Sequence, residues 1–396
     1  MTLDANKSNA LDVPMDALLT KEKVVIIIPT YNEASVIKTT IEQVFAATDT
    51  ILNYELHILI FDSASTDETQ AIVQSLKTRY SKLHLCSELA KSGLGSAYLQ
   101  AMNYALNEMK ADIIFEFDAD LSHQPKYIAP MLEQLEHCDC VVGSRYVPGG
   151  SIPKDWAFHR KLFSVLGNYI ARAVLTPKYK DFTSGFRATR RQHLLKILPQ
   201  RFLTNHYAYK LQLLWLLHKS KARVCEFPIE FIDRDLGDSK LPKNSITDSL
   251  RVVFTLRYYE LRRYLKMCLV GSMGMAVQFG VYNLLRNYLH LSPFSASQLA
   301  VFAAIINNFI LNNKITFRTR YPISRALKMQ RLALFSIYSI SIIYLQSYWL
   351  RLGLLCFGDG ALQENIIMGV GIGLMSLLNY FTYSRHIWGE KLALNN

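Results

Sequence analysis

Four long apolar segments in the last third of the chain limit its fold more than any other feature. They lie at about 267–286, 294–313, 332–350 and 365–384. About 20 apolar residues are enough to cross a bilayer as a helix, and the third and fourth segments contain 19 and 20 consecutive uncharged residues. The pattern therefore predicts an all-α domain of four transmembrane helices over residues 266–390, and it argues against a wholly soluble protein.

Basic charge is concentrated in the same part of the chain. Residues 251–396 contain 15 Lys and Arg but only 4 Asp and Glu, so they carry +11 of the formal net charge of +12. Nucleic-acid binding is compatible with that charge, but the basic residues alternate with apolar runs, so we expect a membrane and no nucleic acid as the partner. Because they gather before the first segment and between the second and third, the positive-inside rule predicts a multi-pass protein whose N-terminal part lies on the cytoplasmic face.

The residues before the first segment alternate between short apolar runs and stretches with helical periodicity. The apolar runs lie at 24–29, 56–61, 83–86, 111–118 and 140–144. Strands that alternate with helices at this spacing predict an α/β domain with a mostly parallel sheet, which we place at residues 23–243. A flexible segment over 1–22 and amphipathic juxtamembrane helices over 244–265 complete the predicted organisation.

The cysteines predict no metal or disulfide framework. They are Cys86, Cys138, Cys140, Cys225, Cys268 and Cys356. None belongs to a C-x-x-C pair, and no histidine cluster completes a zinc set. We therefore expect all six to be free thiols in a reducing compartment.

The sharpest candidate site is Asp118-Ala119-Asp120, which follows the apolar run IIFEF. Ligands of parallel α/β sheets bind beyond the carboxyl ends of the strands, and Asp62 ends another of the predicted strands. Mg²⁺ prefers a few protein carboxylates together with substrate phosphates. Asp118 and Asp120 are therefore predicted to share a divalent ion with a diphosphate.

Residues 160–172 are predicted to form an amphipathic helix. Arg160, Ser164, Asn168 and Arg172 recur every four residues, so they form a polar stripe along one side of it. The other positions are largely apolar, which is typical of a helix at a membrane surface. The stripe could donate hydrogen bonds to a phosphate, although an ordinary half-exposed helix has the same pattern.

Eight short motifs occur in an order that resembles a known family. They are IPTYNE (28–33), Asp62 with STD (65–67), KSGLGSAY (91–98), DADLSHQP (118–125), GSRY (143–146), HRKLFS (159–164), TSGFR (183–187) and FIDRDLGDSKL (231–241). Together they resemble the polyprenyl-phosphate sugar synthases of glycosyltransferase family 2, and most closely the dolichol-phosphate mannose synthases. The four C-terminal segments resemble the GtrA-like membrane domain that some members carry.

This resemblance implies a GT-A catalytic domain, which is Rossmann-like, and the transfer of a sugar from a nucleotide donor to a polyisoprenyl phosphate. The residues that it assigns to the nucleotide sugar are Pro29, Tyr31, Glu33, Asp62, Asp118, Ala119, Asp120, Arg234 and Lys240. It assigns Mg²⁺ or Mn²⁺ to Asp118 and Asp120, and it assigns the acceptor phosphate to Arg145, Arg160 and Ser164. Asp120, Arg145 and Arg160 are the expected catalytic residues.

The resemblance favours GDP-mannose as the donor and direct displacement with inversion, which would give a β-linked polyprenyl-phosphate mannose. UDP-glucose or another nucleotide sugar is the alternative donor. A lipid-linked sugar translocase or a scaffold is a different class of function that stays open, although the intact acidic and basic motifs argue against it. Two positions depart from the family pattern, because Ser63 stands where a second acidic residue is usual and Ser122 where some members have Gln.

Overall fold

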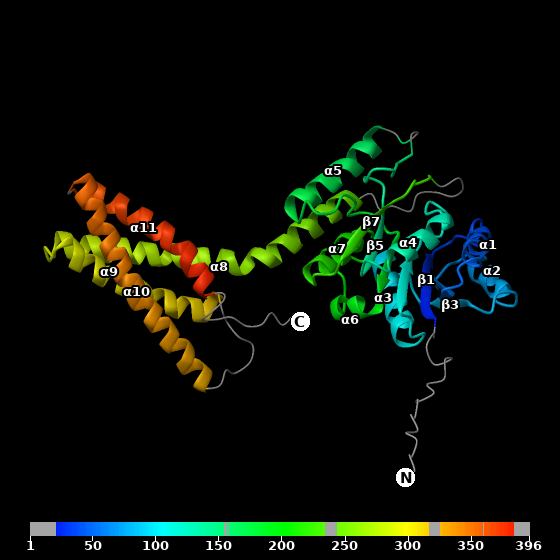
Figure 1. Ribbon diagram of the computed structural model, residues 1–396, viewed down its shortest axis with the longest axis horizontal. Helices are drawn as coiled ribbons and strands as arrows, with labels where there is room; N and C mark the ends of the chain where they lie inside the picture. Colours follow the sequence, from blue (N-terminus) through cyan, green and yellow to red (C-terminus); the bar gives the residue numbers. More distant parts are fainter. Residues whose placement is uncertain are drawn as a thin grey trace, which may run out of the picture. The chain divides into compact units, whose positions relative to one another are not determined.

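The chain forms two compact units, Met1–Arg257 and Tyr258–Asn396. In this computed structural model, the described residues are 21–153, 156, 158–233, 244–316, 325–358 and 360–383. The first unit contains a β-sheet covered by helices, and the described residues of the second unit form long helices and one short helical turn (Figure 1). The predicted division into an α/β part and an all-α part therefore describes the architecture of these residues.

The described part of the first unit is built on a seven-stranded sheet with the order β3-β2-β1-β4-β6-β5-β7. The strands are β1 Glu22–Thr30, β2 Tyr54–Asp62, β3 Leu83–Ser87, β4 Ile113–Glu116, β5 Cys140–Ser144, β6 Arg187–Arg190 and β7 Val224–Pro228. Every neighbouring pair is parallel except those of β6, which runs antiparallel to both β4 and β5. The prediction of a mostly parallel α/β sheet is confirmed.

Helices cover both faces of this sheet (Figure 1). They are α1 Ile37–Thr48, α2 Thr69–Leu76, α3 Leu94–Asn107, α4 Ile128–Gln134, α5 Phe158–Val174, α6 Arg191–Ile197 and α7 Tyr209–Lys219, with a 3₁₀ turn at Pro125–Tyr127. In β1, Val24, Ile26 and Ile28 pack among residues of α1, α2 and α4, whereas Val25 and Ile27 pack among residues of α3, α6 and α7. Burial on both faces explains why this strand is continuously apolar instead of alternating.

Cys138 and Cys225 form a disulfide, so the expectation that all six cysteines are free thiols is wrong for this pair. Cys138 lies just before β5 and Cys225 lies in β7, and these parallel strands are neighbours in the sheet. Their Cα atoms are 6.2 Å apart although the residues are 87 positions apart in the chain. Only the strand order brings them together, and spacing along the sequence carries no sign of it. The other four cysteines are free thiols.

Among the described residues, four helices are long and apolar enough to cross a membrane, as the sequence predicts. Their bounds are α8 Ser245–Asn287, α9 Pro293–Leu311, α10 Arg325–Phe357 and α11 Ala361–Thr382, and a π-helical turn, Asn312–Thr316, follows α9. Helix α8 begins in the first unit, where Val252, Val253 and Leu256 are buried. The juxtamembrane helices expected over 244–265 are therefore not separate from the first span, because α8 contains both without a break.

A charged pair joins two of these helices. Arg286 of α8 contacts Glu364 of α11 with an Nη2–Oε1 distance of 2.8 Å. The hydroxyl of Tyr282 donates a hydrogen bond to the same carboxylate, and Arg286 also donates to the carbonyl of Leu291. Charges in membrane-spanning segments are costly unless they are paired, so this pairing accounts for the presence of Arg286 and Glu364.

Gly93 and Gly149 provide a matched test of the packing at the start of α3. Both have a positive φ, of 102° and 89°, so alanine at either position incurs backbone strain of about 1–3 kcal/mol. At Gly93 a Cβ would also lie 2.5 Å from the carbonyl oxygen of Asn205, whereas at Gly149 the nearest atom is a side-chain carbon 3.4 Å away. We expect Gly93→Ala to lower the unfolding temperature of the α/β unit more than Gly149→Ala, as followed by circular dichroism. Equal shifts would contradict the contact with Asn205.

Candidate active site

Asp118 and Asp120 follow β4, in the middle of the sheet, where the chain turns away from the strand. The carboxylate of Asp118 lies among polar groups: its Oδ2 is 3.6 Å from both Lys210 Nζ and His123 Nε2, and its Oδ1 accepts a 3.4 Å hydrogen bond from the Tyr98 hydroxyl. Asp120 Oδ1 accepts a hydrogen bond from the backbone N–H of Ser122. The two carboxylates predicted from the sequence therefore lie where ligands of such sheets bind.

The surroundings of Asp118 keep its carboxyl group ionised. Burial alone would raise the pKa of Asp118, but the Lys210 ammonium outweighs this effect, and the pKa lies below its usual value. Burial lowers the pKa of His123, and its Nδ1 accepts a hydrogen bond from the backbone N–H of Asp118. His123 is therefore neutral at physiological pH, and its ring is stacked on Phe186 with centroids 4.8 Å apart.

The donor atoms at this position fit a small divalent cation. In the part of the chain that the structure describes, no group of three or more His, Cys, Asp or Glu residues could hold a metal ion. Mg²⁺ does not require such a cage, because it is commonly held by one or two carboxylates, with phosphates and water completing its shell. Asp118 and Asp120 offer that number of hard oxygen ligands, and Mn²⁺ accepts the same donor type.

Lys210 is a site residue that the sequence reasoning missed. It belongs to α7, it is 6% exposed, and its ammonium faces Asp118. A Cβ on Gly185 would overlap the end of the Lys210 side chain, so the glycine of the motif TSGFR leaves the space that this lysine occupies. That glycine was a signal that some side chain approaches the backbone there, but the sequence could not identify which one.

At the end of β4 that leads to the aspartates, a buried polar network connects the sheet to α7. Glu116 in β4 is 1% exposed; its Oε2 lies 3.1 Å from Arg187 Nε, and its Oε1 accepts a hydrogen bond from the Tyr209 hydroxyl. Burial raises the pKa of Glu116 in spite of the arginine. Because Tyr209 stacks on Tyr98, which donates to Asp118, this network helps to fix the position of the Asp118 carboxylate.

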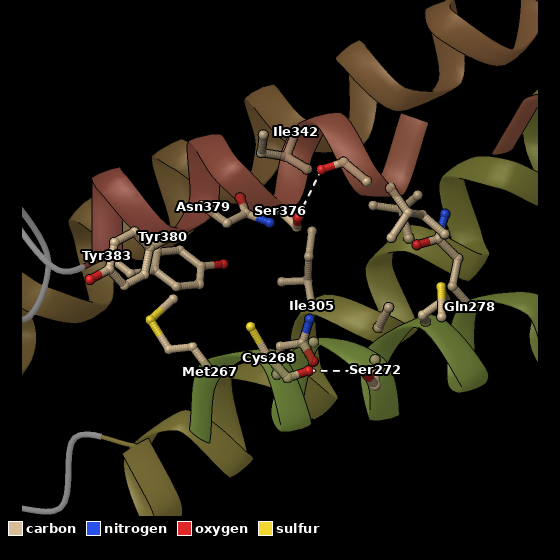
Figure 2. Close-up of a pocket in the computed structure, with 18 of the residues that line it drawn as sticks. Met267, Cys268, Ser272, Gln278, Ile305, Ile342, Ser376, Asn379, Tyr380 and Tyr383 are labelled. Carbon is tan, nitrogen blue, oxygen red and sulfur yellow. Dashed lines mark hydrogen bonds between the residues drawn. The ribbon is translucent and has the colours of Figure 1, made fainter. Parts of the chain in front are cut away.

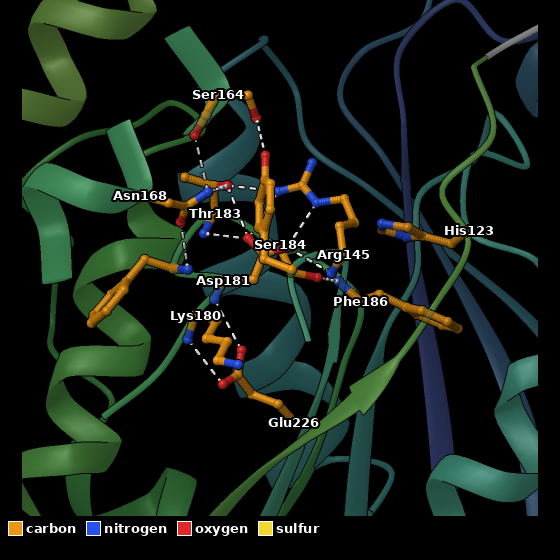
Figure 3. A network of polar contacts seen from close by, with 12 residues as sticks. His123, Arg145, Ser164, Asn168, Lys180, Asp181, Thr183, Ser184, Phe186 and Glu226 are labelled. Carbon is orange, nitrogen blue, oxygen red and sulfur yellow. Dashed lines mark hydrogen bonds and ion pairs between the residues drawn. The ribbon is translucent and has the colours of Figure 1, made fainter. Parts of the chain in front are cut away.

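Arg145 follows β5 and is held by Asp181 (Figure 3). Its Nε and Nη2 donate to the two carboxylate oxygens at 2.7 and 2.8 Å, and Nη2 also donates to Thr183 Oγ1 at 2.7 Å. The backbone N–H groups of Lys180 and Asp181 donate to Glu226 of β7. Burial alone would raise the pKa of Asp181, but the Arg145 guanidinium lowers it below its usual value. Asp181 was also missed from the sequence.

Two residues of the predicted polar stripe of α5 lie at this same cluster. Ser164 Oγ lies 2.7 Å from the Tyr146 hydroxyl, and Asn168 Nδ2 donates to Thr183 Oγ1 while its Oδ1 accepts from the backbone of Phe182 (Figure 3). Arg145 and Ser164, which were predicted to act together, therefore belong to one network. The Arg160 side chain lies outside the described residues, as do Arg234 and Lys240.

Helix α5 exposes an apolar face. The large side chains on it are Phe158, Leu162, Phe163, Val165, Leu166 and Tyr169, each at least 44% exposed. Ser164 and Asn168 of the same helix instead form hydrogen bonds with Tyr146 and Thr183. This division into two faces is the one expected of a helix at a membrane surface.

On the other side of the aspartates, Asp62 joins the loops that follow β1 and β2. Its side chain accepts hydrogen bonds from Thr30 Oγ1, from Ser65 and from Gln70 Nε2, and Asp62 is 0% exposed. Its carboxylate thus organises the loops, and in this arrangement it does not open onto solvent.

The motif IPTYNE, which contains Pro29, runs from the end of β1 toward α1. Tyr31 lies under the Lys91 ammonium, 3.3 Å from its ring centroid, and the backbone N–H of Glu33 donates to Thr69 Oγ1. Thr40 of α1 donates to the carbonyl oxygen of Ala119 at 2.6 Å. This last contact joins α1, which follows the motif, to the turn that contains Asp118 and Asp120.

The ion pair of Arg145 and Asp181 gives a test by unfolding. The side chains are 9% and 0% exposed, and removing one partner of a buried pair costs about 3–5 kcal/mol. We expect Asp181→Asn to lower the free energy of unfolding by that amount in urea denaturation at neutral pH. The pKa of Asp181 is lower in the folded state than in the unfolded state. Its contribution to the free energy of unfolding is therefore fully present above the pKa of the unfolded state and is lost as the pH falls through the folded pKa. The difference between the variant and the native chain should therefore shrink in acid.

Glu42→Gln is the matched control. Glu42 pairs with Arg79, and these side chains are 37% and 68% exposed. An exposed pair contributes about 0–1 kcal/mol. Equal destabilisation by the two substitutions would contradict the role of Asp181.

Comparison with known proteins identifies two regions of the chain. Residues 25–198 match glycosyl transferase family 2, and residues 266–388 match the GtrA/DPMS transmembrane domain. A glucosyl-3-phosphoglycerate synthase from Mycobacterium tuberculosis, solved with Mn²⁺, UDP and glucosyl-3-phosphoglycerate, is similar over 59% of this chain and 78% of its own, at 19% identity and a TM-score of 0.42.

Curated relatives match over longer stretches. The dolichol-phosphate mannosyltransferase of Pyrococcus furiosus is 32% identical over 376 residues, which cover 92% of this chain and 99% of that protein. The polyprenol monophosphomannose synthase of Mycolicibacterium smegmatis is 32% identical over 231 residues, or 58% of this chain and 84% of that protein. The chain therefore belongs to the dolichol-phosphate mannosyltransferase family of glycosyltransferases, with a glycosyl transferase family 2 domain followed by a GtrA/DPMS transmembrane domain.

Proposed function

We propose that this membrane-bound glycosyltransferase transfers mannose from GDP-mannose to a polyisoprenyl phosphate and inverts the anomeric carbon, which gives a β-linked product. The proposal rests on one observation above all: a relative named dolichol-phosphate mannosyltransferase matches this chain over 99% of its own length. Both the catalytic unit and the membrane unit are therefore shared with that protein. The polar site at the end of β4 supplies the chemistry that such a transfer requires.

On the donor side, Asp118 and Asp120 would hold Mg²⁺ or Mn²⁺. When bound there, the cation would neutralise charge on the donor diphosphate, which is the leaving group. Lys210 keeps the Asp118 carboxylate ionised, and His123 accepts a hydrogen bond from the backbone N–H of Asp118. Pro29, Tyr31, Glu33, Asp62 and Ala119 would surround the nucleotide, with Asp62 acting through the loops that it ties together.

On the acceptor side, the lipid phosphate is itself the nucleophile. A phosphate monoester has a second pKa near 6, so at neutral pH it is largely dianionic and needs no strong general base. The protein has to hold two mutually repelling phosphate groups in line. Arg145, fixed by Asp181, together with Arg160 and Ser164, would hold the acceptor, while Arg234 and Lys240 would close over the phosphates.

The acceptor lies in the bilayer, so the site has to work at its surface. The apolar face of α5 is suited to insertion among lipid head groups. The excess of Lys and Arg before the first transmembrane segment and between the second and third supports a cytoplasmic position of the catalytic unit. Nucleotide sugars would then reach the site from the cytoplasm.

The donor can be tested directly. Radiolabelled GDP-mannose and UDP-glucose are offered in parallel to the full-length protein with a polyprenyl phosphate, in detergent with Mg²⁺ or Mn²⁺. We expect label to enter the lipid fraction from GDP-mannose and to fall to background when EDTA removes the cation. Label from UDP-glucose alone would overturn the mannose assignment and keep the reaction type. Label from neither donor would favour the translocase or scaffold function.

Asp120→Asn tests the metal assignment, because the amide is nearly isosteric with the carboxylate but carries no charge. We expect transfer to fall by about 10²–10³-fold or more, as for the loss of a group that stabilises charge in the transition state. The unfolding temperature should change little, since Asp120 is partly exposed. The control is Asp49→Asn at an exposed position after α1, which should leave transfer unchanged. Full activity of Asp120→Asn would contradict the assignment.

A further inference from the structure

The membrane unit contains a cavity between its four helices, to which α8, α9, α10 and α11 all contribute (Figure 2). Its volume is about 310 Å³. A single water needs about 10–15 Å³ measured in this way, and pockets for small molecules begin at about 300 Å³. The cavity is therefore large enough for a small ligand.

The lining is unusually polar for a helix bundle with an apolar exterior. Amide side chains come from all four helices or the turn after α9. They are Gln278, Asn308, Asn312, Gln346 and Asn379. Ser339 and Ser376 add hydroxyl groups, and of the described residues that line the cavity none is Asp, Glu, Lys or Arg. We call it the amide cavity.

Two of these side chains have hydrogen-bonding atoms that the described residues leave unsatisfied. Asn312 Oδ1 and Ser339 Oγ are buried and lack a hydrogen-bond partner among them; the two residues are 3% and 6% exposed. An unsatisfied polar group in a membrane interior costs several kcal/mol. Gln278 and Gln346, in contrast, bond to each other. The amide cavity therefore presents an acceptor at Asn312 and a hydroxyl at Ser339 that a ligand could satisfy.

The backbone is adapted to the position of a third amide. A Cβ on Gly274 would overlap the side-chain amide of Asn308, so only glycine leaves that amide where it lies, next to the cavity. Asn312 stands at the start of the π-helical turn that follows α9, a distortion that is frequent at functional sites. The wall of the cavity therefore contains a glycine that leaves room for an amide and a turn that departs from α-helical geometry.

The chemistry of this lining selects a class of ligand. A phosphate or another anion would require Lys or Arg, and a metal ion would require carboxylates, whereas amides and hydroxyls pair with neutral groups that both donate and accept. A sugar ring has such groups around its whole edge. In a unit whose helices can cross a bilayer, a ligand that arrives from the membrane must also carry a lipid chain.

We propose that the amide cavity binds the uncharged sugar head group of a membrane glycolipid. This inference rests on the proposed function, because the β-linked polyprenyl-phosphate mannose made by the first unit would be the natural source of that head group, with its mannose in the amide cavity and its charged phosphate outside. The membrane unit is then more than an anchor, since it provides a binding site for a sugar that is attached to lipid.

The test uses full-length protein in lipid nanodiscs and a probe that needs no transfer reaction. The probe is octyl β-mannoside with a photoreactive diazirine on its alkyl chain. We expect saturable labelling of peptides from α8 to α11, displaced by unlabelled octyl β-mannoside but by neither octyl phosphate nor free mannose. Asn312→Leu and Asn308→Leu, which keep the side-chain size, should weaken binding at least tenfold, as should Gly274→Ala. The control is Gly280→Ala, at a helical glycine with no atom within 4 Å of a Cβ, and it should bind like the native chain.

Several outcomes would overturn the proposal: labelling that does not saturate, equal binding by Asn312→Leu and Asn308→Leu, or displacement by octyl phosphate. If free mannose displaced the probe as effectively as octyl β-mannoside does, the claim that the bound sugar is attached to a lipid would be wrong. Saturable labelling of a protein that transfers no sugar from any donor would overturn the proposed function and support the cavity. The two failures are therefore distinguishable.

Discussion

The position of the Asp118 carboxylate is the constraint on which the rest of the catalytic unit depends. It is buried enough that its charge must be compensated, and the compensation comes from Lys210, while Tyr98 donates a hydrogen bond from α3. Behind it, Glu116 and Arg187 compensate each other in the sheet itself. Each partner belongs to a different element, so the helices on one face and the strands around β4 have to assemble together before the carboxylate is stable there.

The two units solve the same physical problem in different solvents. In the α/β unit, buried charges form pairs, and Asp62 has its hydrogen bonds satisfied by the loops around it. In the membrane unit, Arg286 and Glu364 follow that rule, but Asn312 and Ser339 do not satisfy theirs among the described residues. Buried polar atoms without a hydrogen-bond partner also occur among the described residues of the α/β unit, but such an atom costs more free energy away from water. The unsatisfied atoms in the membrane unit therefore carry more information about function than the pairs do.

Much of the fold could be predicted from the sequence, because strands and membrane-spanning helices each produce a pattern of residues that lie close together in the chain. The apolar runs predicted the parallel strands, and the long uncharged segments predicted the four helices. What could not be predicted depends on strand order. The antiparallel direction of β6, the disulfide of Cys138 with Cys225 and the pairing of Arg145 with Asp181 all join residues that only the assembled sheet brings together. Lys210 was missed for the same reason, since nothing in the sequence of α7 distinguishes it from a surface lysine.

The charges around the site explain why an arginine for the acceptor would be held by a carboxylate. A free guanidinium among apolar residues would be mobile and would draw any anion, including the nucleotide. Asp181 instead fixes the fork of Arg145 in one direction and cancels its net charge. Lys210 likewise offsets one of the two charges of Asp118 and Asp120. These five side chains together carry one negative charge, so the cation that Asp118 and Asp120 would hold, with the other basic residues of the proposed site, would supply the positive charge that a diphosphate requires.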